Sequence, residues 1–123
     1  MSFRVYDREK VLALLQEGLA YEALQCAAAE LRADREIVRA VVQQDGMALS
    51  CASPELRADP TVVLKAVEQD GHALRYASNE LRGDRDVVLA AVRQCGCALG
   101  YASTTLRDDR LCRSVARCLH YNL

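Results

Sequence analysis

Apolar residues return to equivalent positions every 25 residues along the chain, in groups that a helix would bring to one face. In the segment 60–69 these positions are Val62, Val63, Ala66 and Val67. Their spacing of i, i+1, i+4 and i+5 is typical of the buried face of an α-helix. A shorter apolar stretch, residues 72–77, and a short polar segment follow. Each unit is therefore predicted to contain one helix of roughly ten residues and one or two short helical turns.

Capping residues set the expected limits of these helices. Asp59 is placed to accept a hydrogen bond from a free N–H of the first turn, and Pro60 suits the first helical position because its missing N–H costs nothing there. Ser78 is placed to cap a last short turn, residues 79–82. Gly71 is predicted to end the long helix in the left-handed conformation that favours glycine.

Two motifs carry the repetition. Ala-Leu-x-(Cys/Tyr)-Ala recurs at residues 23–27, 48–52, 73–77 and 98–102, and Leu-Arg-x-Asp recurs at residues 31–34, 56–59, 81–84 and 106–109. Self-similarity at a fixed period is typical of a solenoid, in which each unit buries its apolar face against its neighbours. We therefore expect an all-α solenoid of four to five units in one domain, with an N-terminal capping unit (1–30), three regular repeats (31–105) and a C-terminal capping unit (106–123).

The two ends deviate from the strict period. An insertion of two residues near 18–21 aligns the first unit, and Val11, Leu14 and Leu15 then fall on the core positions. In the last unit the expected apolar face is Leu111, Cys112, Val115 and Ala116, one residue early relative to the period. A polar outer face, here supplied by Arg113 and Arg117, is what a terminal repeat needs.

The combined repeat resembles the DUF4116 family, a domain of unknown function. Over residues 84–103 the agreeing positions are Asp84, Val87, Val88, Ala91, Val92, Gln94, Gly96, Ala98, Leu99, Tyr101, Ala102 and Ser103. The resemblance covers about residues 30–110 and, more loosely, the first unit. It implies a helical repeat fold and no particular activity. The departures are Cys51 where Tyr is usual, Thr105 where Glu is usual, and Cys95 and Cys97 around Gly96.

Composition narrows the classes of function. The 123 residues include 16 basic and 17 acidic side chains, a net charge of −1, so no overall field favours nucleic acid. Residues 1–8 lack the apolar region of a secretory signal, and no apolar stretch of the sequence is long enough to cross a membrane. We expect an intracellular, cytoplasmic protein that is not an integral membrane protein but could be a peripheral subunit of a larger complex; an organellar location after loss of a transit peptide stays open.

Two polar columns run through the motif Leu-Arg-x-Asp. They comprise Arg32, Arg57, Arg82 and Arg107, and Asp34, Asp59, Asp84 and Asp109. We expect a structural ladder, in which each Asp caps a helix and each Arg pairs with an acidic residue of an adjacent unit. A phosphate-binding arginine track is the alternative, and it is disfavoured because an acidic residue two positions away would neutralise each Arg.

Columns whose residues vary are free to contact a partner. The predicted partner-binding residues are Arg39, Leu64, Leu89, Glu68, Arg93 and Arg75. Leu64 and Leu89 would add an apolar strip to this surface. They could instead flank the core. We expect a protein partner, because RNA-reading repeats need an open basic groove with stacking groups, and these columns are mixed in charge.

One group of residues could bind a metal or respond to oxidation: Cys95, Cys97, Cys112 and Cys118, with His72 and His120. Cys-x-Cys is tighter than the usual zinc-knuckle spacing, so zinc is a weak candidate and no cofactor is expected. A disulfide joining Cys112 or Cys118 to Cys95 or Cys97 is a second alternative. Free thiols are the expectation without a secretory signal.

Catalytic motifs are missing from the sequence. Neither His72 nor His120 has a nucleophile and a carboxylate at a recognisable spacing, and no phosphate-binding loop is present. We therefore predict a non-catalytic protein–protein interaction module, acting as a scaffold or accessory subunit of a larger assembly. The alternatives are a nucleic-acid-binding helical repeat and a metal- or redox-responsive module that uses the C-terminal cysteines.

Overall fold

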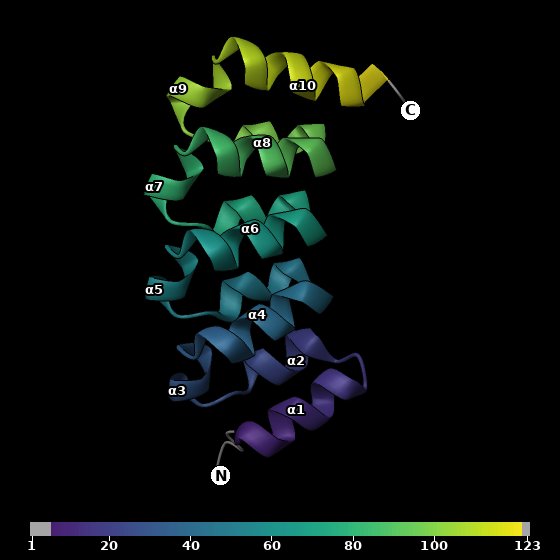
Figure 1. Cartoon of the computed structure of the whole chain (residues 1–123), viewed down its shortest axis with the longest axis vertical. Coiled ribbons are helices and arrows are strands. Elements are labelled where there is room, and N and C mark those ends of the chain that lie inside the picture. Colours follow the sequence, from purple (N-terminus) through teal and green to yellow (C-terminus); the bar gives the residue numbers. More distant parts are fainter. Residues whose placement is uncertain (1–5, 122–123) are drawn as a thin grey trace.

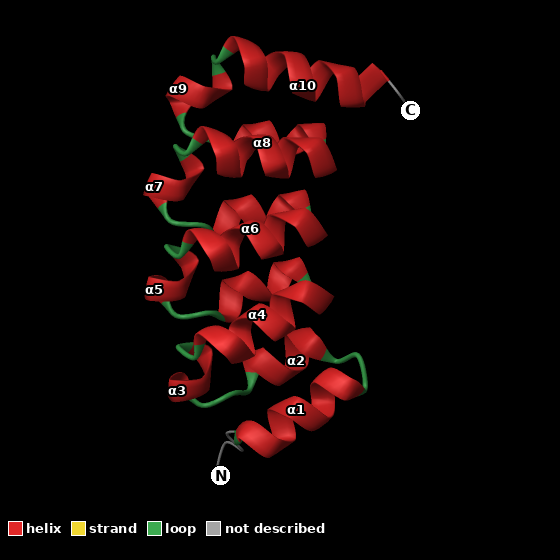
Figure 2. Cartoon of the chain, in the orientation of Figure 1, coloured by secondary structure: helices red, strands yellow, loops and turns green. Residues whose placement is uncertain are grey.

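A computed structural model describes residues 6–121 of the chain, and the side chains of residues 6–117. These residues are helices joined by short loops, with one isolated bridge between Tyr6 and Ala27 and no strands (Figure 2), so the all-α prediction is confirmed. The α-helices are α1 (Arg8–Gln16), α2 (Ala20–Gln25), α3 (Ala29–Arg32), α4 (Arg35–Gln44), α5 (Pro54–Arg57), α6 (Pro60–Gln69), α7 (Asn79–Arg82), α8 (Arg85–Gln94), α9 (Thr104–Arg107) and α10 (Arg110–Tyr121). The 3₁₀ helices are η1 (Gly46–Cys51), η2 (Gly71–Tyr76) and η3 (Gly96–Tyr101).

The long helices lie one above another in sequence order (Figure 1). Each of α4, α6 and α8 packs against the next long helix, and η1, η2 and η3 pack in the same order beside them. The four-residue helices α3, α5, α7 and α9 form one edge of this stack, on the left in Figure 1. Backbone hydrogen bonds join neighbouring units along that edge, for example from Ser78 N–H to the Arg57 carbonyl at 2.9 Å.

Small aliphatic side chains fill the space between the units. The side chains of Val63, Val67 and Leu74 are fully buried, and the described residues include no buried polar or charged side chain. Valine and alanine present short, stiff side chains, so successive long helices can approach closely with few voids. The apolar face predicted for residues 60–69 is the face that α6 buries.

Aspartate caps the long helices, as the sequence predicts. Asp59 accepts a hydrogen bond from the Thr61 N–H at 3.0 Å, and Asp34, Asp84 and Asp109 make the equivalent bond to the residue two positions on. Ser78 accepts from the Leu81 N–H at the start of α7, again as predicted. These caps satisfy N–H groups that have no partner within their own helix.

The prediction that Gly71 ends α6 in the left-handed conformation is wrong. Among the described residues a positive φ occurs at Gly18 alone, where the chain leaves α1. Gly71 instead begins η2, and a Cβ atom added to it would lie 2.5 Å from the Ala91 carbonyl oxygen of the next unit. Gly46 and Gly96 face Ala66 and Ala116 in the same way. Glycine at this position lets the backbones of two units come together.

The first and last units bury most of the apolar residues that the sequence predicts for their core faces. Val11, Leu14 and Leu15 of α1 are buried, as expected from the alignment of the first unit. In the last unit Cys112 is buried and Val115 and Ala116 pack against the core, as predicted, whereas Leu111 is 51% exposed, so its inclusion in the apolar face is wrong. Ala116 faces Gly96 as Ala91 faces Gly71, so the contact between these backbones keeps the 25-residue spacing in α10.

None of the helices among residues 6–121 has the length and apolar character needed to cross a membrane.

Candidate functional site

Ion pairs join consecutive units, but a different arginine column makes them. Arg35, the first residue of α4, contacts Asp59 at 2.6 Å, and Arg8 contacts Asp34 at 3.2 Å. Arg85 contacts Asp109 in the same way. In each pair the first residue of one long helix reaches the aspartate that caps the next.

Hydrogen bonds and ion pairs lower the pKa of two capping aspartates, Asp59 and Asp109. The Thr61 hydroxyl donates a hydrogen bond to Asp59, and this bond, with help from the Thr61 N–H and the Arg35 charge, holds the pKa of the Asp59 carboxyl below its usual value. The Cys112 and Leu111 N–H groups and Arg85 lower the pKa of Asp109. A carboxylate that accepts hydrogen bonds in its charged form is stabilised in that form.

The predicted pairing of Arg32, Arg57, Arg82 and Arg107 with acidic residues is wrong. Among the described residues none of these arginines makes an ion pair. Arg82 donates to the Asn79 side chain, and Arg107 donates to the Thr104 hydroxyl at 3.3 Å, both within their own short helices. The Nε atoms of Arg32 and Arg57 are buried without a hydrogen-bond partner in the described part of the chain.

These arginines line three consecutive clefts along the edge formed by α3, α5, α7 and α9. A cleft of about 360 Å³ between α3 and α5 is lined by Arg32 and Arg57, and one of about 250 Å³ between α5 and α7 is lined by Arg57 and Tyr76. A third, of about 320 Å³ between α7 and α9, is lined by Arg82 and Arg107. We call this row of clefts the arginine edge.

A serine also lines each cleft of the arginine edge. They are Ser53, Ser78 and Ser103. Their hydroxyl oxygens accept a backbone N–H of the following short helix, at 3.3–3.5 Å for Ser78 and Ser103. A hydroxyl that accepts one hydrogen bond still has its own hydrogen to donate. Each cleft thus combines guanidinium and hydroxyl donors, which suit an anionic group.

The predicted partner-binding residues do not form one exposed apolar strip. Leu89 is 9% exposed and belongs to the core, and Leu64 is half-buried against it, as the core-flank alternative predicts. The other four, Arg39, Glu68, Arg75 and Arg93, are exposed. Arg75 lies over the ring of its neighbour Tyr76, 5.5 Å from the ring centroid.

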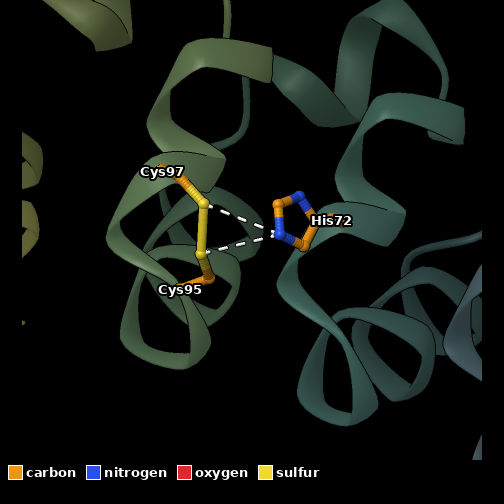
Figure 3. A group of neighbouring side chains, drawn as sticks. All are labelled: His72, Cys95 and Cys97. Carbon is orange, nitrogen blue, oxygen red and sulfur yellow. Dashed lines mark hydrogen bonds between the residues drawn. A yellow bond between two sulfur atoms is a disulfide. The ribbon is translucent and has the colours of Figure 1, made fainter.

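A second group of reactive side chains forms where two units meet (Figure 3). Cys95 and Cys97 are joined by a disulfide at the start of η3, and His72 of η2 faces both sulfur atoms. The His72 Nε2 atom lies 3.8 Å from Cys95 Sγ and 3.6 Å from Cys97 Sγ. On the other side of the ring, Nδ1 is 3.3 Å from the Tyr101 hydroxyl.

The expectation of free thiols is therefore wrong for Cys95 and Cys97, and neither is joined to Cys112. Cys112 is a free, fully buried thiol in the first turn of α10. Burial, followed by the nearby Asp109 charge, raises the pKa of the Cys112 thiol. The side chains of Cys118 and His120 lie outside the described residues.

Comparison with known proteins agrees with the repeat pattern. A family model described as domain of unknown function (DUF4116) matches residues 7–57 and 59–107. The chain belongs to this family. Each matched segment spans two units of the stack. The first runs from the aspartate that caps α1 to the end of α5, and the second from the aspartate that caps α6 to the end of α9. No curated protein and no solved structure matches the chain.

Sequence reasoning missed the ion-pair column of this DUF4116 chain, although a signal was present. An arginine directly follows the capping aspartate of α1, α4 and α8, at Arg8, Arg35 and Arg85. In α6 the residue at this position is Pro60. Because proline carries no charge, Asp84 makes no equivalent ion pair in the part of the chain that the structure describes. The His72 cluster also had a signal, since Cys95 replaces the aspartate found at positions 45 and 70.

Proposed function

We propose that the chain is a non-catalytic protein–protein interaction module that binds an acidic peptide segment along the arginine edge. The observation that carries this proposal is a column of arginines that line clefts and have no ion pair among the described residues. A cationic side chain held in a cleft without a counter-ion favours an anionic ligand.

The aspartates two positions after the arginines do not neutralise them. The acidic residue two positions after each arginine was expected to neutralise it. Asp34, Asp59 and Asp109 instead cap helices and pair with Arg8, Arg35 and Arg85. Arg32, Arg57 and Arg107 are therefore left for a ligand to neutralise.

A peptide suits this edge better than a nucleic acid. Glu30, Glu55 and Glu80 lie exposed on the same short helices, beside the arginines. A nucleic acid strand places a phosphate about every 3.4 Å and would meet these glutamates as well as the arginines. A peptide can place a carboxylate at each cleft and neutral residues between them. The net charge of −1 also gives no general attraction for a polyanion.

The role as a scaffold or accessory subunit, and the cytoplasmic location, are parts of the same proposal. A stack of units offers an extended surface rather than an enclosed site, and such surfaces are typical of repeat proteins that bind partners. The supporting feature here is that equivalent clefts recur along one edge, so a single extended segment could contact several units at once.

Binding of a fluorescent glutamate-rich peptide, followed by anisotropy, tests this proposal. The test variant Arg57→Ser/Arg82→Ser removes two guanidinium groups from the arginine edge. We expect its dissociation constant to rise about tenfold, since each lost contact of a surface ion pair is worth up to about 1 kcal/mol. Helical CD should be unchanged, because neither side chain makes an ion pair with another of the described residues.

The matched control is Arg39→Ser/Arg93→Ser, which removes the same charge from exposed positions of α4 and α8. It should bind the peptide like the unmodified protein. Equal weakening by both double variants would show a general charge effect and refute the arginine edge. Tighter binding of a single-stranded oligonucleotide than of the peptide, with a steep dependence on salt, would support the nucleic-acid alternative instead.

A further inference from the structure

The cluster of His72, Cys95 and Cys97 is a separate feature from the arginine edge. One atom from each of these side chains, Nε2 or Sγ, lies within 4.8 Å of the other two. His72 and Cys95 are half-buried and Cys97 is exposed, so the cluster is shielded on one side and reachable from solvent on the other. We propose that, in the reduced protein, these residues form a binding site for a thiophilic divalent cation of the zinc type.

The stack itself assembles the cluster from two units. His72 is the second residue of η2, and Cys95 and Cys97 flank the first residue of η3. Gly71 allows the backbone of its unit to lie against Cys95, since an added Cβ atom would be 3.3 Å from Cys95 N. The close approach that determines the packing of the units thus also brings the imidazole to both sulfur atoms.

With the two sulfurs still bonded to each other, the distances from the imidazole nitrogen to each sulfur are already close to those in a tetrahedral metal site. Zinc lies about 2.3 Å from a cysteine sulfur and about 2.0 Å from a histidine nitrogen, which places those two ligand atoms about 3.5 Å apart. The His72 Nε2 atom lies 3.6 Å from Cys97 Sγ and 3.8 Å from Cys95 Sγ. The ligand set of one nitrogen and two sulfurs leaves a fourth position, which a water molecule can occupy.

The second ring nitrogen of His72 is also held in the way that metal-binding histidines require. Nδ1 lies 3.3 Å from the Tyr101 hydroxyl of the next unit, and the two rings meet edge to face. When Nδ1–H donates to the Tyr101 oxygen, the lone pair of Nε2 points to the sulfurs. A hydrogen bond to the other nitrogen fixes both the tautomer and the orientation of a ligating imidazole.

The cysteines replace residues with ordinary structural roles in the other units. Asp45 and Asp70 occupy the position of Cys95, and each caps its 3₁₀ helix through a hydrogen bond to the residue two positions on. Cys95 makes no such bond. Met47 and His72 occupy the position of Cys97. The third 3₁₀ helix therefore lacks the capping hydrogen bond of the other two, at the place where two cysteines meet an imidazole. This loss indicates a chemical role for Cys95 and Cys97.

The disulfide is the metal-free, oxidised form of this site. Two molecules of a thiol reductant supply two electrons and two protons: the Cys95–Cys97 bond breaks, each sulfur gains a hydrogen, and the reductant leaves as its own disulfide. Metal binding then releases the two thiol protons to solvent, because thiolates are the ligating form. Oxidation of Cys95 and Cys97 removes both sulfur ligands at once, so the site binds metal only when reduced.

Titration of the full-length reduced protein with Co²⁺ under anaerobic conditions tests the site. We expect one equivalent to bind with the thiolate-to-cobalt charge-transfer absorption, and Zn²⁺ to displace it. Cys95→Ser and Cys97→Ser should each abolish that absorption, and His72→Leu should raise the dissociation constant at least about tenfold. The matched control is Cys26→Ser, which removes an exposed thiol from another unit and should leave binding unchanged. The oxidised protein should bind no cobalt.

Failure of the reduced protein to bind cobalt, while its CD spectrum is native, would overturn the proposal. So would binding that persists in both Cys95→Ser and Cys97→Ser, or that is lost in Cys26→Ser. The result does not depend on the acidic-peptide proposal, because His72, Cys95 and Cys97 do not line the clefts of the arginine edge.

Discussion

Glycines at the start of η1, η2 and η3 show how single residues determine the spacing between units. Each one faces a backbone carbonyl of the next long helix, and for Gly71 the carbonyl is that of Ala91. The sequence indicated that glycine was needed here, but the reason given, a left-handed backbone, was wrong. A glycine between two helices can be required either by a left-handed backbone or by the close approach of another backbone. At Gly71 the close approach involves a residue 20 positions away, which the local sequence does not reveal.

Substitution of Gly71 by alanine should destabilise the fold by about 2 kcal/mol, because the added Cβ atom would overlap the Ala91 carbonyl and push two units apart. The expected fall in melting temperature is about 6–10 °C. Gly100→Ala is the matched control, since nothing lies within 4 Å of its added Cβ atom. Equal melting temperatures for the two variants would contradict the close-approach explanation.

The charge of Asp59 should make stability depend on pH in a defined direction. Its folded pKa lies below the ordinary value of 3.8, so its contribution is fully present above that pH and is lost as pH falls below it. Asp59→Asn keeps a capping oxygen but removes the charge. We expect the stability difference between wild type and variant, measured by urea unfolding, to be constant from about pH 6 to pH 5 and to shrink below about pH 4. A difference that grows on acidification would contradict this sign.

At the scale of the helices, the sequence predicted the long elements well. Asp59, Pro60 and the spacing of Val62, Val63 and Ala66 define α6 within its observed bounds, because caps and amphipathic spacing are local properties. The apolar stretch 72–77 was predicted only as a short turn, and it forms the 3₁₀ helix η2. Capping of η2 by Asp70 was also missed, although Asp45 and Asp70 stand at the same place in consecutive units.

Restoring that cap in the third unit should stabilise η3. Cys95→Asp places a carboxylate where Asp45 and Asp70 accept a backbone N–H, so we expect the variant to exceed the reduced wild type in unfolding free energy by about 0.5–1 kcal/mol. Cys95→Ala should give no gain. Urea unfolding in reducing buffer measures both. A less stable Cys95→Asp protein would show that the thiol itself has a structural role in the fold.

At the scale of the whole molecule, the contacts between units were the hardest part to predict. The repeat told us that equivalent residues stack, and the family and the all-α fold followed from it. It did not tell us which residue of one unit meets which residue of the next. Arg35 pairs with Asp59 of the next unit. Arg32 stands only two positions before Asp34 in the sequence, yet it makes no ion pair among the described residues. Such choices depend on helix orientation and side-chain reach across a gap, which a single sequence does not encode locally.

The same limit applies to both candidate sites. From their variability, Leu64 and Leu89 were predicted either to form a partner-facing strip or to flank the core. A variable position can be a buried one, and Leu89 is 9% exposed. The arginine edge and the His72 cluster each combine residues from consecutive units, so they exist only in the stacked form. Cys95 and Cys97 could be named as candidates from the sequence, whereas their contact with His72, 23 residues earlier than Cys95, could not be derived from it.

The central claim, that the arginine edge is the binding surface, is tested most directly by NMR mapping. Backbone amide shifts of the isotope-labelled protein would be recorded during titration with the glutamate-rich peptide. The largest changes should fall in α3, α5, α7 and α9 and at Ser53, Ser78 and Ser103. Changes confined instead to the exposed faces of α4, α6 and α8, around Arg39, Glu68 and Arg93, would contradict the account.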